Sequence, residues 1–390
     1  MAVLPSASSS PALAMVAGEA SGDLLAGLLL DGLRQRWPNL RAAGIGGTQM
    51  RARGFEAWWP SDLLAVHGYS AELARRLLQL LALRRTLRRR LCAGPAGLFV
   101  GVDAPDFNLA LEMRLRSAGW RTAHFVCPSI WAWRAHRVEQ LRRSADHVLC
   151  LFPFEPALLA QHGIAATYVG HPLAQFLAPQ PDVAAARRQL GIPEHAKVLA
   201  LLPGSRRGEV AHLALPFFQA AAKVQQARGA IEIVVPALPS VSDAIVAAAR
   251  SAGVREPRVV EGQSHAVLAA CDVALVASGT ATLEAALLGR PMVIAYRVGP
   301  IAYRLMRRQQ LQPWVGLPNI LCRDFVVPEL LQEMATPDAM ATALLRWLDA
   351  PEQEPALLAG LQQRFAALHA ELRRDTATIA ADALAPLLPR

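Results

Sequence analysis

Two turns rich in small residues carry the groups best suited to hold a diphosphate. The first follows an apolar run at 197–202 and contains Gly204, Ser205 and Arg206. Glycine lets the backbone turn tightly, and N–H groups at a helix start beside an arginine suit an anion. The second turn reads Ser-Gly-Thr-Ala-Thr-Leu-Glu, and its candidate ligands are Ser278, Gly279, Thr280 and Glu284, the last for ribose hydroxyls. Together they predict a nucleotide-sugar site, with ordinary helix caps as the alternative.

A carboxylate follows a strand in the first half of the chain. Asp103 comes directly after the apolar run at 98–102, where it is well placed to deprotonate a hydroxyl. Pro105 disfavours helix at the preceding residue and holds this turn open. The alternative is that Asp103, Asp106 and Asn108 only cap the next helix. A further polar turn, Gly-Glu-Ala-Ser-Gly-Asp, supplies Glu19 and Ser21 as candidate substrate contacts.

Several other chemistries lack their motifs. The sequence has no GxxxxGK[ST] phosphate loop, no complete GxGxxG fingerprint and no DxD pair, so we expect no metal and no cofactor. Its five cysteines form no CxxC, which disfavours a zinc site or a disulfide framework and favours a reducing cytoplasm. No clean apolar stretch of about 20 residues predicts a membrane span, and the N-terminus has no basic region typical of a signal peptide.

The elements that position these turns alternate as short apolar strands and helices of 10–15 residues. Such alternation predicts α/β domains with parallel sheets, which bind ligands beyond the carboxyl ends of their strands. The alternation of strands and helices is interrupted by a proline-rich stretch after Pro172 and then resumes. We therefore predict two doubly wound, Rossmann-like domains facing across a cleft, at 1–172 and 173–354. A tail at 355–390 has helical spacing and is expected to pack back across the domains or onto a partner protomer.

The positive charge is concentrated in one segment. Of the net charge of +9, +7 falls within residues 61–150, and 38 of the 40 basic side chains are arginine. Within 63–91 a leucine-rich helical stretch carries seven arginines, which suits a membrane interface because arginines reach phosphates from an apolar face. The alternative is a core-packed helix with a solvated basic face. No nucleic-acid motif accompanies the charge. The candidate membrane contacts are Leu73, Arg76, Leu77, Leu80, Arg84 and Arg88.

Several motifs occur in order along most of the chain. They read GEASGD, FVGVDAPDFN, CPSIWAWR, YVGHPL, LLPGSRRGEV, SGTATLEAALLGRPMVIAYR and GLPNILC. This series resembles the lipid-A-disaccharide synthase family of inverting glycosyltransferases with the GT-B fold. The resemblance covers residues from about Ala12 to Glu333 and rests on several linked motifs.

The resemblance implies a reaction and a role for each motif. UDP-2,3-diacylglucosamine would donate its sugar to 2,3-diacylglucosamine 1-phosphate, forming the β(1→6) lipid A disaccharide 1-phosphate and UDP. Asp103 would be the general base, and Arg206 would neutralise the leaving diphosphate. Ser278, Thr280 and Glu284 would contact diphosphate and ribose, and Asn319 is retained in a motif whose first position departs to Gly316. The family implies metal-free transfer, a homodimer that exchanges C-terminal segments, and a cytoplasmic enzyme peripheral to the inner face of the inner membrane.

Two other functions remain open on sequence alone. Another GT-B protein, either a glycosyltransferase of peptidoglycan precursors or a UDP-sugar epimerase, would share the nucleotide turns. An epimerase would convert the donor without an acceptor lipid. A non-catalytic module that binds a membrane surface through residues 63–91 would bind vesicles without releasing UDP.

Overall fold

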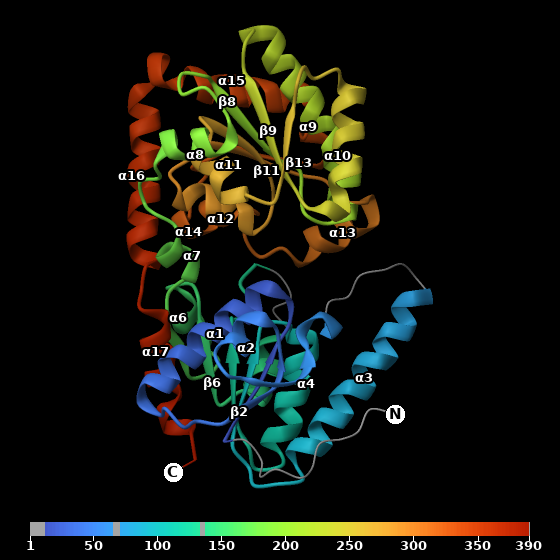
Figure 1. Cartoon of the computed structure of the whole chain (residues 1–390), viewed down its shortest axis with the longest axis vertical. Helices are drawn as coiled ribbons and strands as arrows, with labels where there is room; N and C mark the ends of the chain where they lie inside the picture. The colour runs from blue at the N-terminus through green and yellow to red at the C-terminus, as the bar shows by residue number, and fades with distance from the viewer. Residues whose placement is uncertain (1–11, 65–70, 133–136, 390) are drawn as a thin grey trace. The chain divides into compact units, whose positions relative to one another are not determined.

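The chain folds into two α/β units, each built on its own parallel sheet (Figure 1). The computed structural model describes residues 12–64, 71–132 and 137–389. Unit 1 comprises the chain up to Pro172 together with Leu372 onward, and unit 2 comprises Leu173–Glu371. The fold class expected from the alternation of strands and helices is confirmed, with two parallel sheets.

Unit 1 contains a seven-stranded sheet in the order β3-β2-β1-β4-β5-β6-β7, with every neighbouring pair parallel. Its strands are β1 (Leu13–Ala17), β2 (Ala42–Gly46), β3 (Glu56–Pro60), β4 (Leu98–Val102), β5 (Arg121–Phe125), β6 (His147–Cys150) and β7 (Ala166–Tyr168). Its helices are α1 (Glu19–Arg36), α2 (Thr48–Ala52), α3 (Ala71–Leu91), α4 (Pro105–Arg116), α5 (Arg137–Ser144), α6 (Glu155–Ala160) and α17 (Thr376–Leu384), with 3₁₀ turns at Ser61–Leu64 and Ala385–Leu387.

Unit 2 contains a six-stranded parallel sheet in the order β10-β9-β8-β11-β12-β13. Its strands are β8 (Val198–Leu202), β9 (Glu232–Ala237), β10 (Arg258–Glu261), β11 (Val273–Ala277), β12 (Met292–Tyr296) and β13 (Glu329–Leu331). Its helices are α8 (Val183–Leu190), α9 (Arg207–Arg228), α10 (Pro239–Ala252), α11 (Ser264–Ala270), α12 (Thr280–Leu287), α13 (Pro300–Gln309), α14 (Leu317–Cys322), α15 (Pro337–Gln353) and α16 (Pro355–Leu372), with a 3₁₀ turn at Gln332–Met334. The short helix α7 (Pro172–Phe176) lies where the chain passes from unit 1 to unit 2.

The central strands of both sheets are buried on both faces. All five residues of β1, β4, β8 and β11 are buried, which agrees with their uninterrupted apolar sequences. The sequence did not predict β3 or β13, which are edge strands with partly exposed residues. An edge strand packs against one neighbour, so its sequence is under weaker demand to be apolar.

The C-terminal tail is helical, as its spacing predicted. Leu361, Phe365, Leu368 and Leu372 of α16 are buried, whereas Leu357 is exposed. Helix α16 belongs mainly to unit 2, and α17 belongs to unit 1, where it packs along α1. The His171 N–H donates to the Leu372 carbonyl at 2.9 Å inside unit 1, which ties the returning chain to this unit.

Helix α3 divides into a buried part and an exposed part. Leu87 and Leu91, near its C-terminal end, are fully buried in the core of unit 1, and Leu80 packs partly against that core. Leu77 and Leu78 are 51% and 69% exposed. Within the described ranges, no helix combines the length and the apolarity that a membrane span requires.

Candidate functional site

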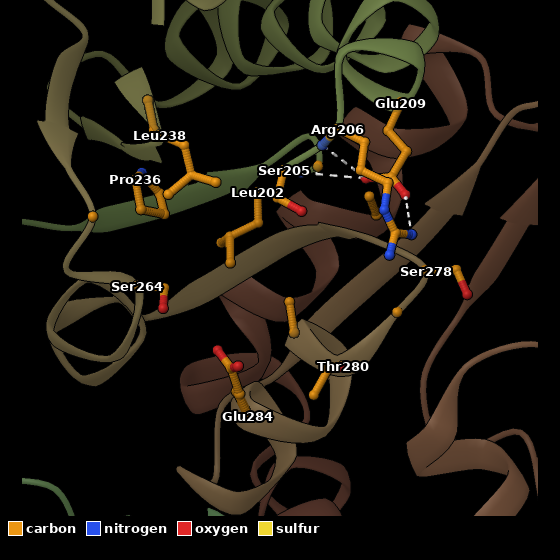
Figure 2. Close-up of a pocket in the computed structure, with 16 residues that line it drawn as sticks. Leu202, Ser205, Arg206, Glu209, Pro236, Leu238, Ser264, Ser278, Thr280 and Glu284 are labelled. Atoms are coloured by element: carbon orange, nitrogen blue, oxygen red, sulfur yellow. Dashed lines mark hydrogen bonds and ion pairs between the residues drawn. The ribbon is translucent and has the colours of Figure 1, made fainter. Parts of the chain in front are cut away.

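A cavity of about 360 Å³ opens at the carboxyl ends of β8, β9 and β11 in unit 2 (Figure 2). Both small-residue turns singled out in the sequence line it, so the structure brings them together. Its lining comprises Leu202, Gly204, Ser205, Arg206, Glu209, Pro236, Ala237, Leu238, Gly262, Ser264, Ala277, Ser278, Gly279, Thr280, Ala281 and Glu284. We call this cavity the donor pocket, after the donor that the sequence resemblance implies for these two turns.

The first turn presents the N-terminus of α9 to the donor pocket. Arg206 is the N-cap, and its side chain is 72% exposed. The Glu209 carboxylate accepts from the backbone N–H groups of Ser205 at 3.2 Å and Arg206 at 3.4 Å, and it lies 3.4 Å from the Arg206 guanidinium. Glu209 therefore supplies the carboxylate that caps the start of α9. Glu209 was missed, although its place three residues after the N-cap is the signal of a capping box.

The second turn presents the N-terminus of α12 from the other side. Gly279 is the N-cap with a φ of 156°, so the chain enters the helix in a conformation that favours glycine. Glu284 lies one turn in, and one of its carboxylate oxygens is 3.5 Å from Nε2 of His265. That contact raises the pKa of His265 above its usual value. In Figure 2, Thr280 and Glu284 lie across the pocket from Glu209.

The backbone of unit 1 is left-handed at the carboxyl ends of three neighbouring strands. Glu19 after β1, Asp103 and Ala104 after β4, and Val126 after β5 have φ values of 54°, 52°, 43° and 82°. A non-glycine residue in this region costs about 1–3 kcal/mol and persists where surrounding contacts enforce it, often at functional sites. Strain is thus concentrated at the edge where the sequence placed Asp103.

Asp103 is held by its backbone at both ends. Its N–H donates to the Phe125 carbonyl at 2.8 Å, and its carbonyl accepts from Nδ2 of Asn108 at 2.8 Å. The N-cap of α4 is Ala104 and has no side-chain cap, so Asp103 does not cap this helix. Within the described ranges, no hydrogen bond or ion pair is made by the Asp103 carboxylate. A half-buried carboxylate on a fixed backbone is thereby left available to a ligand.

Asn108 and Glu112, one turn apart on α4, form a buried polar layer beneath Asp103. Asn108 is fully buried, and its Nδ2 also lies 3.4 Å from the carbonyls of Val16 and Val102 at the ends of β1 and β4. Glu112 Oε1 is 2.7 Å from Nδ1 of His124 on β5, and both side chains are fully buried. Burial raises the pKa of Glu112.

Gly101 on β4 makes room for this layer. A Cβ atom at Gly101 would lie 2.1 Å from Glu112 Oε1 and 2.7 Å from Cβ of Asn108, so no larger residue fits. Glu112 and His124 were not singled out by sequence. Glu112 could have been found from its spacing, because a residue four positions after Asn108 lies on the same face of the helix. That helix follows a strand that contains glycine.

The Gly-Glu-Ala-Ser-Gly-Asp turn divides between the surface and the core. Glu19 and Ser21 are exposed at the start of α1, on the same sheet edge as Asp103. Asp23 is buried instead, and accepts from the N–H groups of Gly47 at 2.8 Å and Gln49 at 2.7 Å, which caps α2. Glu19 and Ser21 belong to unit 1 and do not line the donor pocket.

Asn319 is held in the interior of unit 2 by hydrogen bonds to its neighbours. It is fully buried, and its Nδ2 donates to the Val327 carbonyl at 2.9 Å and to Glu329 at 2.8 Å. The Glu329 carboxylate also accepts from the Gly316 N–H at 2.9 Å. Asn319 is not part of the lining of the donor pocket; it joins α14 to the edge strand β13.

The candidate membrane contacts on α3 differ among themselves. Leu77 and Arg88 are exposed, whereas Leu80 and Arg84 are half-buried. Burial and the nearby Arg114 lower the pKa of Arg84. Arg90 lies over the ring of Trp58 at 3.9 Å. The side chains of Leu73 and Arg76, like residues 65–70 of the predicted membrane segment, fall outside the described part of the structure.

An aromatic cluster surrounds a buried carboxyl group near the ends of β5 and β6. Trp131 packs edge-on against Phe152 and Phe154, and its Nε1 donates to Glu155 at 2.9 Å. Burial raises the pKa of Glu155 to about 7. Burial also lowers the pKa of His171, which stacks on Phe152, to about 4.

No metal-binding group of three or more His, Cys, Asp or Glu side chains occurs among the described residues. The positively charged groups that line the donor pocket are the Arg206 side chain and the N-termini of α9 and α12. The five cysteines are free thiols.

Comparison with known proteins gives a family match over almost the whole chain. The family model described as lipid-A-disaccharide synthetase matches residues 13–384. The lipid-A-disaccharide synthase of Verminephrobacter eiseniae is 64% identical over 377 residues, covering 96% of this chain and 97% of that protein. The enzyme of the same name from Albidiferax ferrireducens is 60% identical over the same shares of the two chains.

Solved structures with much lower identity share the fold. The UDP-GlcNAc 2-epimerase of Neisseria meningitidis bound to UDP-GlcNAc has a TM-score of 0.60 at 11% identity, with 96% of this chain and 98% of that chain covered. A UDP-forming α,α-trehalose-phosphate synthase from Burkholderia vietnamiensis has a TM-score of 0.58 at 13% identity, with coverages of 96% and 99%. Both a glycosyltransferase and an epimerase are thus found on this fold, so the fold alone does not select the reaction.

Proposed function

The chain belongs to the lipid-A-disaccharide synthase family, and from that premise we propose how its two units divide the reaction. The protein is a GT-B glycosyltransferase that forms the lipid A disaccharide from lipid-linked sugars. Its donor is UDP-2,3-diacylglucosamine, and its acceptor is 2,3-diacylglucosamine 1-phosphate. The family match over residues 13–384 carries this assignment.

We propose that unit 2 binds the UDP part of the donor. The N-termini of α9 and α12 and the Arg206 guanidinium supply positive charge for the diphosphate. In this proposal Glu284, which lines the pocket, accepts from the ribose hydroxyls. Pro236 and Leu238 give the pocket an apolar side, against which the flat uracil ring packs.

We propose that Asp103 is the general base. It takes the proton of the acceptor's 6-hydroxyl as that oxygen attacks the anomeric carbon of the donor. The bond from this carbon to the diphosphate oxygen breaks, and the electron pair leaves with UDP. Arg206 and the α9 N-terminus stabilise the developing negative charge, and attack from the opposite face inverts the anomeric centre.

The remaining site residues take supporting roles in this proposal. Glu19 and Ser21, exposed on the same sheet edge as Asp103, contact the acceptor sugar. Asn319 acts indirectly, because it holds α14 against β13 and does not reach the donor pocket. The exposed leucines and arginines of α3 contact the inner face of the inner membrane. Self-association as a homodimer is also proposed, from the family alone.

The decisive experiment measures UDP release with donor alone and with donor plus acceptor, for the parent and two variants. Asp103→Ala should lower kcat by at least about a hundredfold, the scale of general-base catalysis, while the UDP dissociation constant stays nearly unchanged. Arg206→Ala should lower kcat/KM for the donor by at least about tenfold, because it removes a charge from the leaving group. The same assay with EDTA tests metal-independent transfer.

Each part of the assay has a contradicting result. UDP release without acceptor would favour a hydrolase or a hydrolysing epimerase, and conversion of the donor to another UDP-sugar without UDP release would favour a non-hydrolysing epimerase. Loss of less than about threefold in Asp103→Ala would remove its role as base. An Arg207→Ala variant is the matched control for Arg206, because Arg207 is an exposed neighbour that does not line the pocket. Equal losses of kcat/KM in the two variants would mean that overall positive charge, and not the position of Arg206, is responsible.

A further inference from the structure

Exposed apolar side chains gather in two places. Eight of the twelve large apolar side chains that are exposed among the described residues fall into two sets of four. One set belongs to unit 1, at Leu63 in the 3₁₀ turn and at Leu77, Leu78 and Leu81 of α3. The other set lies in unit 2, at Leu215, Leu311, Phe325 and Met334, with exposures of 41 to 65%. Nothing in the donor site or the proposed base requires the second set.

The second set lines two adjoining grooves around α13. One groove, of about 1010 Å³, contains Leu215 and the arginines Arg297, Arg304, Arg307 and Arg308. The other, of about 780 Å³, contains Leu311, Phe325 and Met334. Tyr303, Arg307 and Glu333 line both grooves, so they form one continuous surface, which we call the α13 surface.

The charge of the α13 surface is strongly positive. Arg304, Arg307 and Arg308 are exposed and recur at helical spacing, and no ion pair involves them within the described ranges. Arg297 donates to the Gln332 carbonyl at 3.1 Å. The facing acids are Glu333, which is exposed, and Glu329, whose oxygens accept from Val315, Gly316 and Asn319.

We propose that the α13 surface binds an anionic lipid bilayer, as a membrane contact of unit 2 separate from α3. Arginines beside exposed leucine, phenylalanine and methionine match a lipid interface, where phosphates lie next to acyl chains. A free phosphate would use the arginines but not the apolar side chains. A second copy of this chain docked through the same surface would bring exposed arginines against exposed arginines.

The α13 surface adjoins the donor pocket through α9. The first turn of α9 lines the donor pocket at Glu209, and the next turns line the larger groove at His212 and Leu215. The inference rests on the proposed function in one respect: a donor with two acyl chains needs an apolar surface near its nucleotide site. Unit 2 supplies that surface itself.

The test is vesicle co-sedimentation of the full chain without substrates. Arg304→Gln/Arg308→Gln should weaken binding to vesicles with about 30% phosphatidylglycerol by about twentyfold, because each arginine near an anionic surface contributes about fivefold. The matched control is Arg250→Gln/Arg255→Gln, which removes two exposed arginines of unit 2 outside the α13 surface. It should change binding by less than about threefold. Leu311→Ser/Met334→Ser should weaken binding to anionic and to neutral phosphatidylcholine vesicles alike.

The outcomes separate this proposal from its alternatives. Equal weakening in the α13 and control variants, or weakening only in Arg88→Gln/Arg89→Gln on α3, would overturn it. Full displacement from vesicles by millimolar inorganic phosphate at constant ionic strength would identify a phosphate site and would also overturn it. Failure of the parent protein to form the disaccharide would refute the proposed function. The vesicle-binding result could still be interpreted, because sedimentation does not require turnover. UDP affinity of every variant should equal that of the parent.

Discussion

The carboxyl edges of the two sheets solve different physical problems. In unit 2, glycines at positive φ precede helix N-termini, and Arg206 stands exposed above them. In unit 1, the left-handed positions are occupied by non-glycine residues, and the polar groups Asn108, Glu112 and His124 beneath them are fully buried. Diphosphate binding needs backbone N–H groups and space, whereas a general base needs one side chain held in a fixed direction.

This difference determines where each edge is vulnerable. Under the proposed function, a change at the edge of unit 2 alters the shape or charge of an open pocket, so we expect its effect to fall on donor affinity. A change beneath the edge of unit 1 releases strained backbone at Asp103, so we expect its effect to fall on turnover. Single substitutions in either unit can therefore test this difference between the two edges.

Among the substitutions that test the supports of the two edges, the largest effect is expected from Asn108→Ala. Removing Nδ2 leaves the Asp103 carbonyl without its 2.8 Å partner and frees the left-handed turn. We expect kcat to fall about thirtyfold, with the UDP dissociation constant within about twofold of the parent, because misplacement of a catalytic group by about 1 Å is costly. The free energy of unfolding should fall by about 1–3 kcal/mol.

The control is Ser144→Ala in the same unit. Ser144 is also fully buried, and its hydroxyl donates to the Leu109 carbonyl of α4 at 2.8 Å. This variant should lose similar stability and keep its kcat. If both variants lost turnover equally, Asn108 would be merely structural and the two edges would not differ in kind.

A smaller effect is expected from Gly204→Ala in unit 2. Gly204 has a φ of 120°, and a Cβ there would lie 2.6 Å from Cβ of Glu209. The turn must shift, which moves the N-terminus of α9, so we expect the UDP dissociation constant to rise about tenfold with kcat at saturating donor nearly unchanged.

Gly208→Ala is its matched control. Gly208 lies in the first turn of the same helix, and no atom lies within 4 Å of a Cβ built there. Isothermal titration with UDP should give the parent affinity for this variant. An unchanged affinity in Gly204→Ala would show that the turn does not depend on its glycine.

The same contrast explains which features the sequence revealed. Strand alternation and the glycine turns are local patterns, so the two sheets and the lining of the donor pocket at Gly204 and Gly279 were predictable. Asp103 was predictable because it directly follows an apolar strand. The contacts of Asn108, Glu112 and His124 join α4 to β4 and β5, and such tertiary pairing leaves no periodic signal. The burial of Asn319 against Glu329 is likewise a tertiary contact that its motif did not reveal.

The smallest expected effect is a pH dependence of unfolding that belongs to the aromatic cluster of unit 1. Burial raises the pKa of Glu155 to about 7, so the folded state holds a proton that the unfolded chain releases near its ordinary value of 4.5. Its contribution to stability is therefore present below 4.5 and lost as the pH rises to about 7. His171 acts oppositely, because its pKa is lowered to about 4 from 6.5, and stability is lost as the pH falls through that window.

These opposing contributions largely cancel in the parent between about pH 4.5 and 6.5, so single variants are needed to see them. In thermal unfolding, the midpoint of Glu155→Gln relative to the parent should rise by a few degrees between about pH 4.5 and 7 and then stay level. The midpoint of His171→Asn relative to the parent should instead rise as the pH falls from about 6.5 to 4. Glu112 is present in all three proteins, so its own raised pKa cancels from both differences. Differences independent of pH in both variants would mean that these groups titrate normally, and that this end of unit 1 is as open to water as the donor pocket.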